Sequence, residues 1–269
     1  MSTLSISLIQ ADLDWENKDN NLAYFSEKIF ALRRKTELVV LPEMFNTGFT
    51  MNAAAFAESM DGPSITWMKK QAEENRIILT GSLIVKENDN YFNRLLWVMP
   101  NGEMGYYDKR HLFAYGGEHK HFTAGNKRLV ASVKGWRINL QICYDLRFPV
   151  WSRQQVKNRE AEYDVLIYVA NWPERRSHAW KTLLCARAIE NQCYCIGVNR
   201  VGVDGNGIEH SGDSLVVGPL GEVLYHCKGK EDVFSILLDK HELEESRNKF
   251  PFLQDADQFF IRTESGDEE

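Results

Sequence analysis

The sequence lacks three features that would point to a membrane or nucleic-acid protein. No hydrophobic run approaches the roughly 18 residues that a membrane-spanning helix needs. The first residues lack a basic segment followed by a long apolar one, so we expect no signal peptide. The chain has 32 Lys and Arg residues against 38 Asp and Glu residues, for a formal net charge of −6. Without a basic excess, nucleic acid is a poor partner.

Cysteine is also scarce and shows no pairing pattern. The five cysteines are odd in number and widely spread over 269 residues, which does not resemble a disulfide framework. A reducing cytoplasm therefore suits the chain best. A zinc site needs about four ligands at suitable spacing, and the pairs His119/His121 and Cys193/Cys195 do not supply them. We expect no metal and no cofactor.

What is present is the composition and patterning of a globular α/β protein. The hydrophobic fraction of 43% and the charged fraction of 26% are ordinary for such a protein. Early helical patterns alternate with strands, and late strands follow one another as hairpins, which predicts mixed sheets in two layers covered by helices. We expect one domain over residues 1–260 and a disordered acidic tail over 261–269.

Hydrophobic periodicity predicts the individual elements. Helices are expected over residues 19–34, with Asp19 as the N-cap, and over 64–75, 150–158, 177–190 and 240–247. Residues 110–126 show little periodicity. The expected strands are 4–8, 38–41, 77–85, 91–99, 104–108, 136–142, 163–170, 193–198, 215–217, 223–226 and 233–238.

Cys143 occupies a position that suits a nucleophile. The strand before it alternates, which places Trp136, Ile138, Leu140 and Ile142 on one face and Cys143 on the more polar face. A thiol at the point where a strand turns can be exposed to a substrate near free backbone N–H groups. A free cysteine is, however, more often part of a hydrophobic core.

Two other predicted strands end in residues that such a thiol requires. Glu43 follows the strand 38–41, and Lys109 follows the strand 104–108. Sites in open α/β sheets gather outside the carboxyl ends of strands, so the three side chains are expected to converge. Taken singly, each has a structural explanation, since Glu and Lys are mostly surface residues.

Together the three residues form a coherent hydrolytic set. Glu43 can take the proton from Cys143, because the thiolate is the nucleophile. Lys109 and the backbone N–H of Tyr144 can stabilise the oxyanion of a tetrahedral intermediate. Protonated Glu43 can then give its proton to a leaving amine and later activate water. The predicted reaction is hydrolysis of an amide or related C–N bond through a thioester.

Three segments resemble the signature blocks of the nitrilase, or carbon–nitrogen hydrolase, superfamily. They are Leu-Pro-Glu-Met-Phe at 41–45, Tyr-Asp-Lys-Arg-His-Leu-Phe at 107–113, and Cys-Tyr-Asp-Leu-Arg-Phe-Pro at 143–149. The resemblance implies a four-layer αββα sandwich, a Glu–Lys–Cys triad carried onto Glu43, Lys109 and Cys143, and homodimers. It also implies a second glutamate that positions lysine and substrate, for which Glu118 is the candidate.

The 143–149 block, Gly-Glu-His at 117–119 and Ala-Asn-Trp-Pro at 170–173 are most similar to the omega-amidase branch. That branch hydrolyses the terminal amide of 2-oxoglutaramate and 2-oxosuccinamate, which implies a small-molecule substrate with a carboxylate at its far end.

A carboxylate is best bound by an arginine, since the guanidinium can bind it in a bidentate manner. Arg147, Arg175 and Arg176 follow strand ends and are candidates, although each could equally be a solvated surface residue. Arg147 could instead pair with Asp145 in its own turn, so the roles of these two residues stay open. Aromatic residues that could form the pocket wall are Phe113, Tyr115 and Trp172.

Other functions remain open. A cysteine peptidase would pair Cys143 with His178 or His210 as its base. Another amidase, a nitrilase or a carbamoylase would share the superfamily motifs. A non-catalytic scaffold would keep the fold alone.

Overall fold

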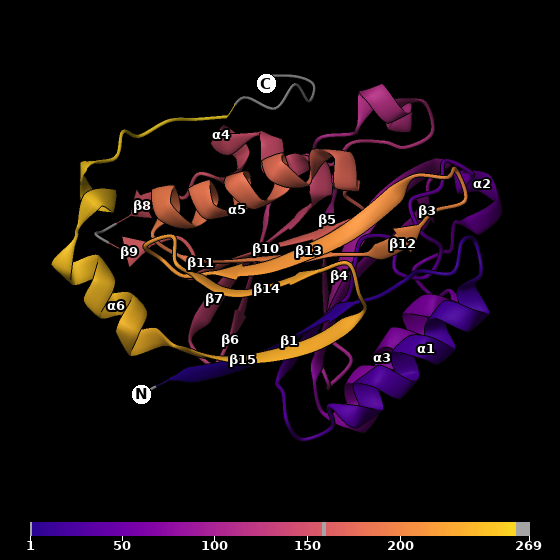
Figure 1. Cartoon of the computed structure of the whole chain (residues 1–269), viewed down its shortest axis with the longest axis horizontal. Helices are drawn as coiled ribbons and strands as arrows, with labels where there is room; N and C mark the ends of the chain where they lie inside the picture. Colours follow the sequence, from indigo (N-terminus) through magenta and orange to yellow (C-terminus); the bar gives the residue numbers. More distant parts are fainter. Residues whose placement is uncertain (1, 158–159, 262–269) are drawn as a thin grey trace.

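The computed structural model describes residues 2–157 and 160–261 of the chain. Two mixed β-sheets pack face to face, with helices on the outer faces (Figure 1). The first sheet has the order β15-β1-β2-β3-β4-β5. Its strands are β1 (Thr3–Gln10), β2 (Leu38–Val40), β3 (Ile78–Glu87), β4 (Asn90–Val98), β5 (Met104–Asp108) and β15 (Asp232–Asp239).

The second sheet has the order β12-β13-β11-β10-β7-β6, and β14 pairs with β13. Parallel pairing at its centre joins β7, β10 and β11, whereas the other pairs are antiparallel. The strands are β6 (Leu129–Val133), β7 (Trp136–Ile142), β10 (Val165–Ala170), β11 (Tyr194–Asn199), β12 (Val201–Val203), β13 (Glu209–Val217) and β14 (Val223–Lys228). A separate two-stranded ribbon pairs β8 (Val156–Lys157) with β9 (Glu160–Ala161).

Three hydrophobic clusters separate four layers. One lies between the sheets, a second joins the first sheet to α1 (Lys18–Ala31) and α3 (Pro63–Asn75), and a third joins the second sheet to α5 (Ser177–Asn191). The remaining α-helices are α2 (Ala53–Phe56), α4 (Pro149–Ser152) and α6 (Lys240–Lys249). The predicted αββα sandwich with two mixed sheets is therefore confirmed.

Strand β7 explains how the sheets pack. Trp136, Ile138, Leu140 and Ile142 are all buried in the cluster between the sheets, as their alternation predicts. The opposite face of β7 carries Asn139 and Gln141, and Gln141 Oε1 accepts a hydrogen bond from Ser152 Oγ of α4 at 3.1 Å. Because the pleat alternates, Cys143 leaves the strand on this second face.

The predicted helix over residues 150–158 is wrong. Helix α4 ends at Ser152, and Arg153 has an extended ψ of 120°. The backbone N–H of Gln154 donates to Asn191 Oδ1 at 3.0 Å, and its side-chain oxygen accepts from the N–H of Tyr163 at 3.2 Å. These tertiary hydrogen bonds outweigh helical propensity and lead the chain into β8. Asn158 lies outside the described residues.

The expected start of α1 is also wrong by two residues. Asn17 is the N-cap, because its side chain accepts from the N–H of Asn20 at 3.2 Å, and Asp19 lies in the first turn. Strands β6 and β12 and the short helix α2 were not predicted. The aperiodic segment 110–126 contains two 3₁₀-helices, η1 (Ala114–Gly116) and η2 (Glu118–Lys120).

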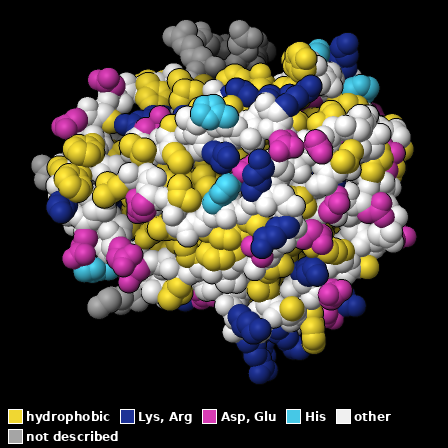
Figure 2. Space-filling model, in the orientation of Figure 1, with side chains coloured by type: hydrophobic (Ala, Val, Ile, Leu, Met, Phe, Trp, Pro, Cys, Tyr) yellow, Lys and Arg dark blue, Asp and Glu magenta, His cyan; other side chains and the backbone are white. Residues whose placement is uncertain are grey.

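The surface carries charges of both signs. Figure 2 shows Lys and Arg side chains interspersed with Asp and Glu over the face of β14 and β15. No helix in the described part of the chain has the length and apolar character of a membrane span. Of the tail expected over residues 261–269, Ile261 is partly buried against the cluster between the sheets, which contradicts disorder at that residue, and 262–269 lie outside the described residues.

Candidate active site

Glu43 lies three residues beyond β2 and is fully buried. Its Oε1 accepts hydrogen bonds from Asn93 Nδ2 at 2.8 Å and from Lys109 Nζ at 2.9 Å. Its Oε2 accepts the backbone N–H of Asn171 at 2.8 Å. Three donors thus fix this carboxylate in one orientation, which a general base requires.

Lys109 directly follows β5 and is also buried. Besides Glu43, its Nζ contacts Glu118 Oε2 at 2.9 Å and Oε1 at 3.0 Å. Burial alone would lower the pKa of Lys109, but the charges of Glu118 and Glu43 outweigh it and raise that pKa. Lys109 is therefore an ammonium ion at neutral pH, as an oxyanion stabiliser must be.

Glu118 begins η2 and is buried beside the lysine. Its Oε2 accepts the backbone N–H of Phe113 at 2.6 Å, so the carboxylate closes the loop that contains it. Burial raises the pKa of Glu118, while Lys109 opposes the shift. The structure thus places the predicted second glutamate in contact with the predicted lysine.

Cys143 is the first residue of η3 (Cys143–Arg147), directly after β7. Its φ of +44° lies in the left-handed region, which non-glycine residues rarely occupy. The thiol is half-buried and lines a cavity. A nucleophile on a strained turn at a strand end is presented to a ligand rather than packed into the core.

The electrostatics around Cys143 keep it protonated at rest. Burial raises the pKa of the thiol well above its usual value, and the negative charge of the Glu43 carboxylate raises it further. Lys109 acts in the opposite direction but is outweighed. The thiolate must therefore form during reaction, with a base beside it.

The three predicted side chains meet across the sandwich rather than along one sheet. Glu43 and Lys109 come from strands of the first sheet, whereas Cys143 comes from the second. The predicted convergence does not depend on one sheet, because the three strand ends are divided between the two sheets. Packing of the two sheets face to face supplies the convergence instead.

A cavity of about 280 Å³ opens onto this cluster. Its lining includes all of the residues predicted to bind substrate: Phe113, Tyr115, Arg147, Trp172, Arg175 and Arg176, together with Tyr144. Tyr115 is 83% exposed and stands at the surface end of the lining. A volume of this size suits a small molecule and is too small for a polypeptide chain.

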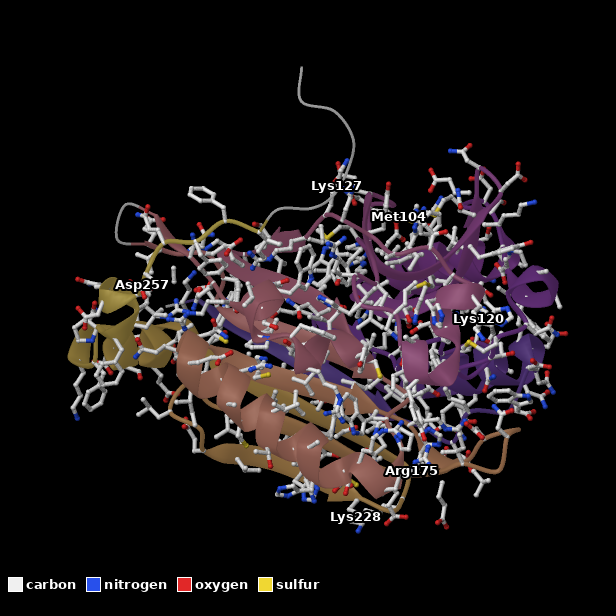
Figure 3. The ribbon with its side chains drawn as sticks, turned by 90° about the horizontal axis from the view of Figure 1, so that it is seen from above. Met104, Lys120, Lys127, Arg175, Lys228 and Asp257 are labelled. Atoms are coloured by element: carbon white, nitrogen blue, oxygen red, sulfur yellow. The ribbon has the colours of Figure 1, made fainter. Side chains whose placement is uncertain are left out.

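The arginines differ in their surroundings. Arg147 stacks over the ring of Trp172 at 4.8 Å, and the half-buried Arg176 stacks over Phe113 at 5.2 Å. Burial lowers the pKa of Arg176, and the charges of Arg175 and Arg147 lower it further. Arg175 is exposed, and Figure 3 shows it at the lower edge of the molecule, far from Asp257. Within residues 2–157 and 160–261, no salt bridge neutralises any of the three arginines.

The structure separates the roles of Asp145 and Arg147. Asp145 is buried and accepts hydrogen bonds from Tyr107 Oη at 2.7 Å and from the backbone N–H of His111 at 3.0 Å and of Ile142 at 3.0 Å. It therefore holds the turn that presents Cys143. Arg147 lines the cavity instead, so the suggested pairing of these two residues is wrong.

The histidines required by a cysteine peptidase do not serve Cys143. His178 is exposed on α5. His210 lines the cavity, but its Nδ1 lies 3.0 Å from the carbonyl oxygen of Ile208, and burial lowers its pKa to about 4. The carboxylate of Glu43, by contrast, acts electrostatically on the Cys143 thiol. Among the described residues, no cluster of three or more His, Cys, Asp or Glu side chains is arranged to hold a metal ion.

Several residues of the site were not predicted from the sequence. Asn93 and Asn171 hold Glu43, and Phe49 places its ring 5.0 Å from Lys109 Nζ. Met51 and His210 complete part of the lining. Two adjacent polar residues, Asn93 and Arg94, within the predicted strand 91–99 are a detectable signal, whereas loop residues such as Phe49 give none.

Comparisons with known proteins agree with this arrangement. The family model for carbon-nitrogen hydrolases matches residues 5–248. The omega-amidase YafV of Escherichia coli K12 is 43% identical over 260 residues, covering 96% of this chain and 99% of its own. A 2-oxoglutaramate amidase of Bacillus subtilis is 32% identical over 254 residues, covering 93% and 96%.

A solved structure supports the same assignment. A carbon-nitrogen hydrolase superfamily protein from Xanthomonas campestris, crystallised with an arsenic adduct in its active site, is 43% identical to this chain. It superposes with a TM-score of 0.96 over 97% of this chain and 100% of its own. The chain therefore belongs to the carbon-nitrogen hydrolase family, on the omega-amidase branch that its sequence motifs predict.

Proposed function

We propose that this enzyme is an omega-amidase, which hydrolyses the terminal amide of a small 2-oxo dicarboxylic acid monoamide to the 2-oxo acid and ammonia. The substrates in view are 2-oxoglutaramate and 2-oxosuccinamate. One observation carries the proposal: the same small cavity is lined by the Cys143 thiol beside Lys109 and by three arginines. The names of the relatives from Escherichia coli and Bacillus subtilis support it.

Acylation follows from the electrostatic coupling between Cys143 and Glu43. Glu43 accepts the thiol proton as the sulfur attacks the amide carbon, which forms a tetrahedral intermediate with a negatively charged oxygen. Lys109 Nζ and the backbone N–H of Tyr144 donate to that oxygen. Protonated Glu43 then transfers its proton to the amide nitrogen, ammonia leaves, and a thioester remains on Cys143.

Deacylation reverses the roles of the same groups. Glu43 takes a proton from a water molecule, the hydroxide attacks the thioester carbon, and the same two donors stabilise the second oxyanion. The thiolate leaves and is reprotonated by Glu43, which restores the resting thiol. Glu118 holds Lys109 throughout, because it contacts the Nζ through both oxygens.

The far end of the substrate matches the arginines. Arg176 is the candidate to bind its carboxylate, since it is half-buried, lies near Cys143 and has no neutralising carboxylate in the described structure. Arg147 adds a second positive charge, and Arg175 a third at the exposed edge. This charge also disfavours amino-acid amides such as glutamine, whose ammonium group would be repelled.

Steady-state kinetics on 2-oxoglutaramate, 2-oxosuccinamate, glutamine and a simple nitrile test the proposal. We expect ammonia release from the first two, with kcat/KM at least about 100-fold higher than for glutamine, which corresponds to about 2.7 kcal/mol of selectivity. Preference for the nitrile or for a carbamoyl compound would instead place the enzyme in another branch of the family. If none of these compounds is hydrolysed, a non-catalytic scaffold is favoured.

We further propose that the enzyme is a cytoplasmic homodimer whose residues 1–260 fold as one unit. Five free thiols are compatible with a reducing compartment. Light scattering is expected to give twice the mass of the chain, and a monomer at micromolar concentration would contradict the dimer. A single unfolding transition in urea is expected for one cooperative unit.

A further inference from the structure

Two adjacent buried polar residues interrupt β4: Arg94, which pairs with Asp108 and Glu87, and Asn93. Asn93 is fully buried, as are Leu95, Leu96 and Val98 farther along the strand. A buried polar side chain is costly unless it forms hydrogen bonds, so its presence calls for a specific partner. The ladder places this asparagine opposite Lys109: the next pair is Arg94 with Asp108, and the N–H of Lys109 donates to the carbonyl of Asn93 at 3.0 Å.

The side chain of Asn93 faces the two glutamates of the site. Its Nδ2 lies 2.8 Å from Glu43 Oε1 and 3.4 Å from Glu118 Oε1. The shorter contact goes to the candidate base and the longer one to the second glutamate. The backbone carbonyl of Asn93 binds Lys109, and its side-chain amide binds the two glutamates. Asn93 thus contacts all three charged residues that surround the thiol.

The charges of the cluster explain why a neutral donor is needed there. Glu43 and Glu118 are two buried carboxylates that share one cation, the Lys109 ammonium. Like charges at such short separation cannot both stay ionised without enough donors, and a proton is then taken up by one of them. A proton on Glu43 would occupy the position that must receive the proton of Cys143.

We infer that Asn93 is a positioning residue that acts through Glu43: its amide keeps this carboxylate ionised and oriented toward the thiol, and leaves Glu118 as the partner of Lys109. The inference rests on the proposed role of Glu43 as the base. Asn93 has no substrate to contact, because it is absent from the cavity lining.

Kinetics of Asn93→Ala as a function of pH test this role. The carboxylate form of Glu43 loses a hydrogen-bond donor in this variant. The acidic limb of the pH profile of kcat/KM for 2-oxoglutaramate should therefore move to higher pH by about one unit. A shift of this size is equivalent to one hydrogen bond to a charged group. At a pH on this limb, kcat should fall about 10-fold while KM changes by less than about threefold, because substrate binding is untouched.

Asn93→Asp separates charge from packing. The substitution preserves shape, removes the donor and adds a third carboxyl group, so its acidic limb should move farther than that of Asn93→Ala. Asn75→Ala is the matched control, since Asn75 is a buried asparagine whose Nδ2 donates to the Gln71 carbonyl at 2.9 Å, away from the site. This control variant should be less stable than the wild type, but the acidic limb of its kcat/KM profile should not move. A loss of kcat with unmoved limbs in both Asn93 variants would overturn the inference.

A readout without substrate distinguishes failure of the inference from failure of the proposed function. Iodoacetamide alkylation of Cys143, followed by peptide mass mapping, has an acidic limb that reports transfer of the thiol proton to Glu43. This limb should also move upward in both Asn93 variants. If the wild-type enzyme does not hydrolyse 2-oxoglutaramate but the alkylation limb shifts, the substrate assignment is wrong and the inference stands. An unshifted alkylation limb contradicts the inference whatever the substrate.

Discussion

At the scale of single residues, the thiol of Cys143 is suppressed until its base acts. Burial and the adjacent Glu43 raise its pKa, and only Lys109 favours the thiolate. Such an arrangement protects the nucleophile from oxidation and couples its activation to proton transfer. Glu43 therefore has two opposing effects on the thiol: it raises the thiol pKa, and it accepts the proton.

Replacement of Glu43 by Gln separates these effects. Turnover should fall about 10²–10⁴-fold, because the general base and acid is lost. The acidic limb of Cys143 alkylation should disappear, and the alkaline limb should move to lower pH, because removal of the neighbouring anion lowers the thiol pKa. Glu103→Gln, at an exposed turn, is the control. An alkaline limb that moves upward would contradict the electrostatic account.

Replacement of Arg176 by Gln tests the carboxylate end of the substrate. We expect kcat/KM for 2-oxoglutaramate to fall about 10- to 100-fold, the usual value of a charge-assisted hydrogen bond, mainly through KM. Hydrolysis of a neutral amide such as butyramide should change little. Arg175→Gln, at an exposed position, should have a much smaller effect. Equal losses for both amides would exclude carboxylate binding by Arg176.

Sequence reasoning reached the three candidate residues that the structure brings together but not the residues that hold them in place. Glu43, Lys109 and Cys143 could be predicted because each follows a recognisable strand and matches a family motif. Asn171 could not be assigned, since it reaches the Glu43 carboxylate through its backbone N–H, a group that every non-proline residue carries, while its side-chain amide donates to the Glu43 backbone carbonyl. The choice among the arginines required three-dimensional burial.

At the scale of elements, η3 is a turn stabilised by the hydrogen bonds of the Asp145 carboxylate. The carboxylate accepts the N–H of Ile142 and the hydroxyl of Tyr107, so it joins the end of β7 to β5 of the other sheet. Tyr107 Oη also accepts from Trp151 Nε1 at 3.0 Å. This network compensates the left-handed conformation of Cys143, which costs on the order of 1–3 kcal/mol.

Asp145→Asn should weaken this element. The amide group would direct a donor at groups that already donate, so we expect a loss of about 2 kcal/mol in the free energy of unfolding. Turnover should also fall, because the turn that presents Cys143 is no longer fixed. Urea unfolding and kcat measure the two effects, with Asp61→Asn at an exposed site as the control. Unchanged stability would show that the network does not support the turn.

The elements that were predicted well have strong local signals, such as the alternation of β7 and the apolar stripe of α5. The segment after α4 has a helical pattern, yet Gln154 and Tyr163 draw it into an extended path through hydrogen bonds to distant residues. Local periodicity cannot report such contacts. The short strands β6 and β12 depend in the same way on their partners in the sheet.

At the scale of the whole molecule, the site exists only because two sheets pack together. Asn171 extends from β10 of the second sheet to Glu43 of the first through its backbone N–H, so the sandwich is joined at the site itself. The sequence motifs predicted which fold would form, but not that the three catalytic candidates would lie across the sheet interface.

His210 makes the stability of the whole molecule depend on pH. Its pKa is about 4 in the folded protein against an ordinary value of 6.5, so the unfolded chain binds more protons between these values and stability falls as pH falls through this window. Between pH 7 and pH 5 this residue should cost about 2 kcal/mol of unfolding free energy. His210→Asn should remove that loss in urea unfolding, whereas His178→Asn, at an exposed site, should not. Equal pH dependence in the wild type and His210→Asn would contradict the assignment.

The central claim is that Cys143, activated by Glu43 and Lys109, hydrolyses an amide. Ammonia release from 2-oxoglutaramate by the wild-type enzyme and by Cys143→Ser, measured side by side at equal concentrations of folded protein, tests it most directly. We predict sustained release by the wild type and none above background by the variant, with the same melting temperature for both. Release by the variant at a rate comparable to that of the wild type would contradict the claim.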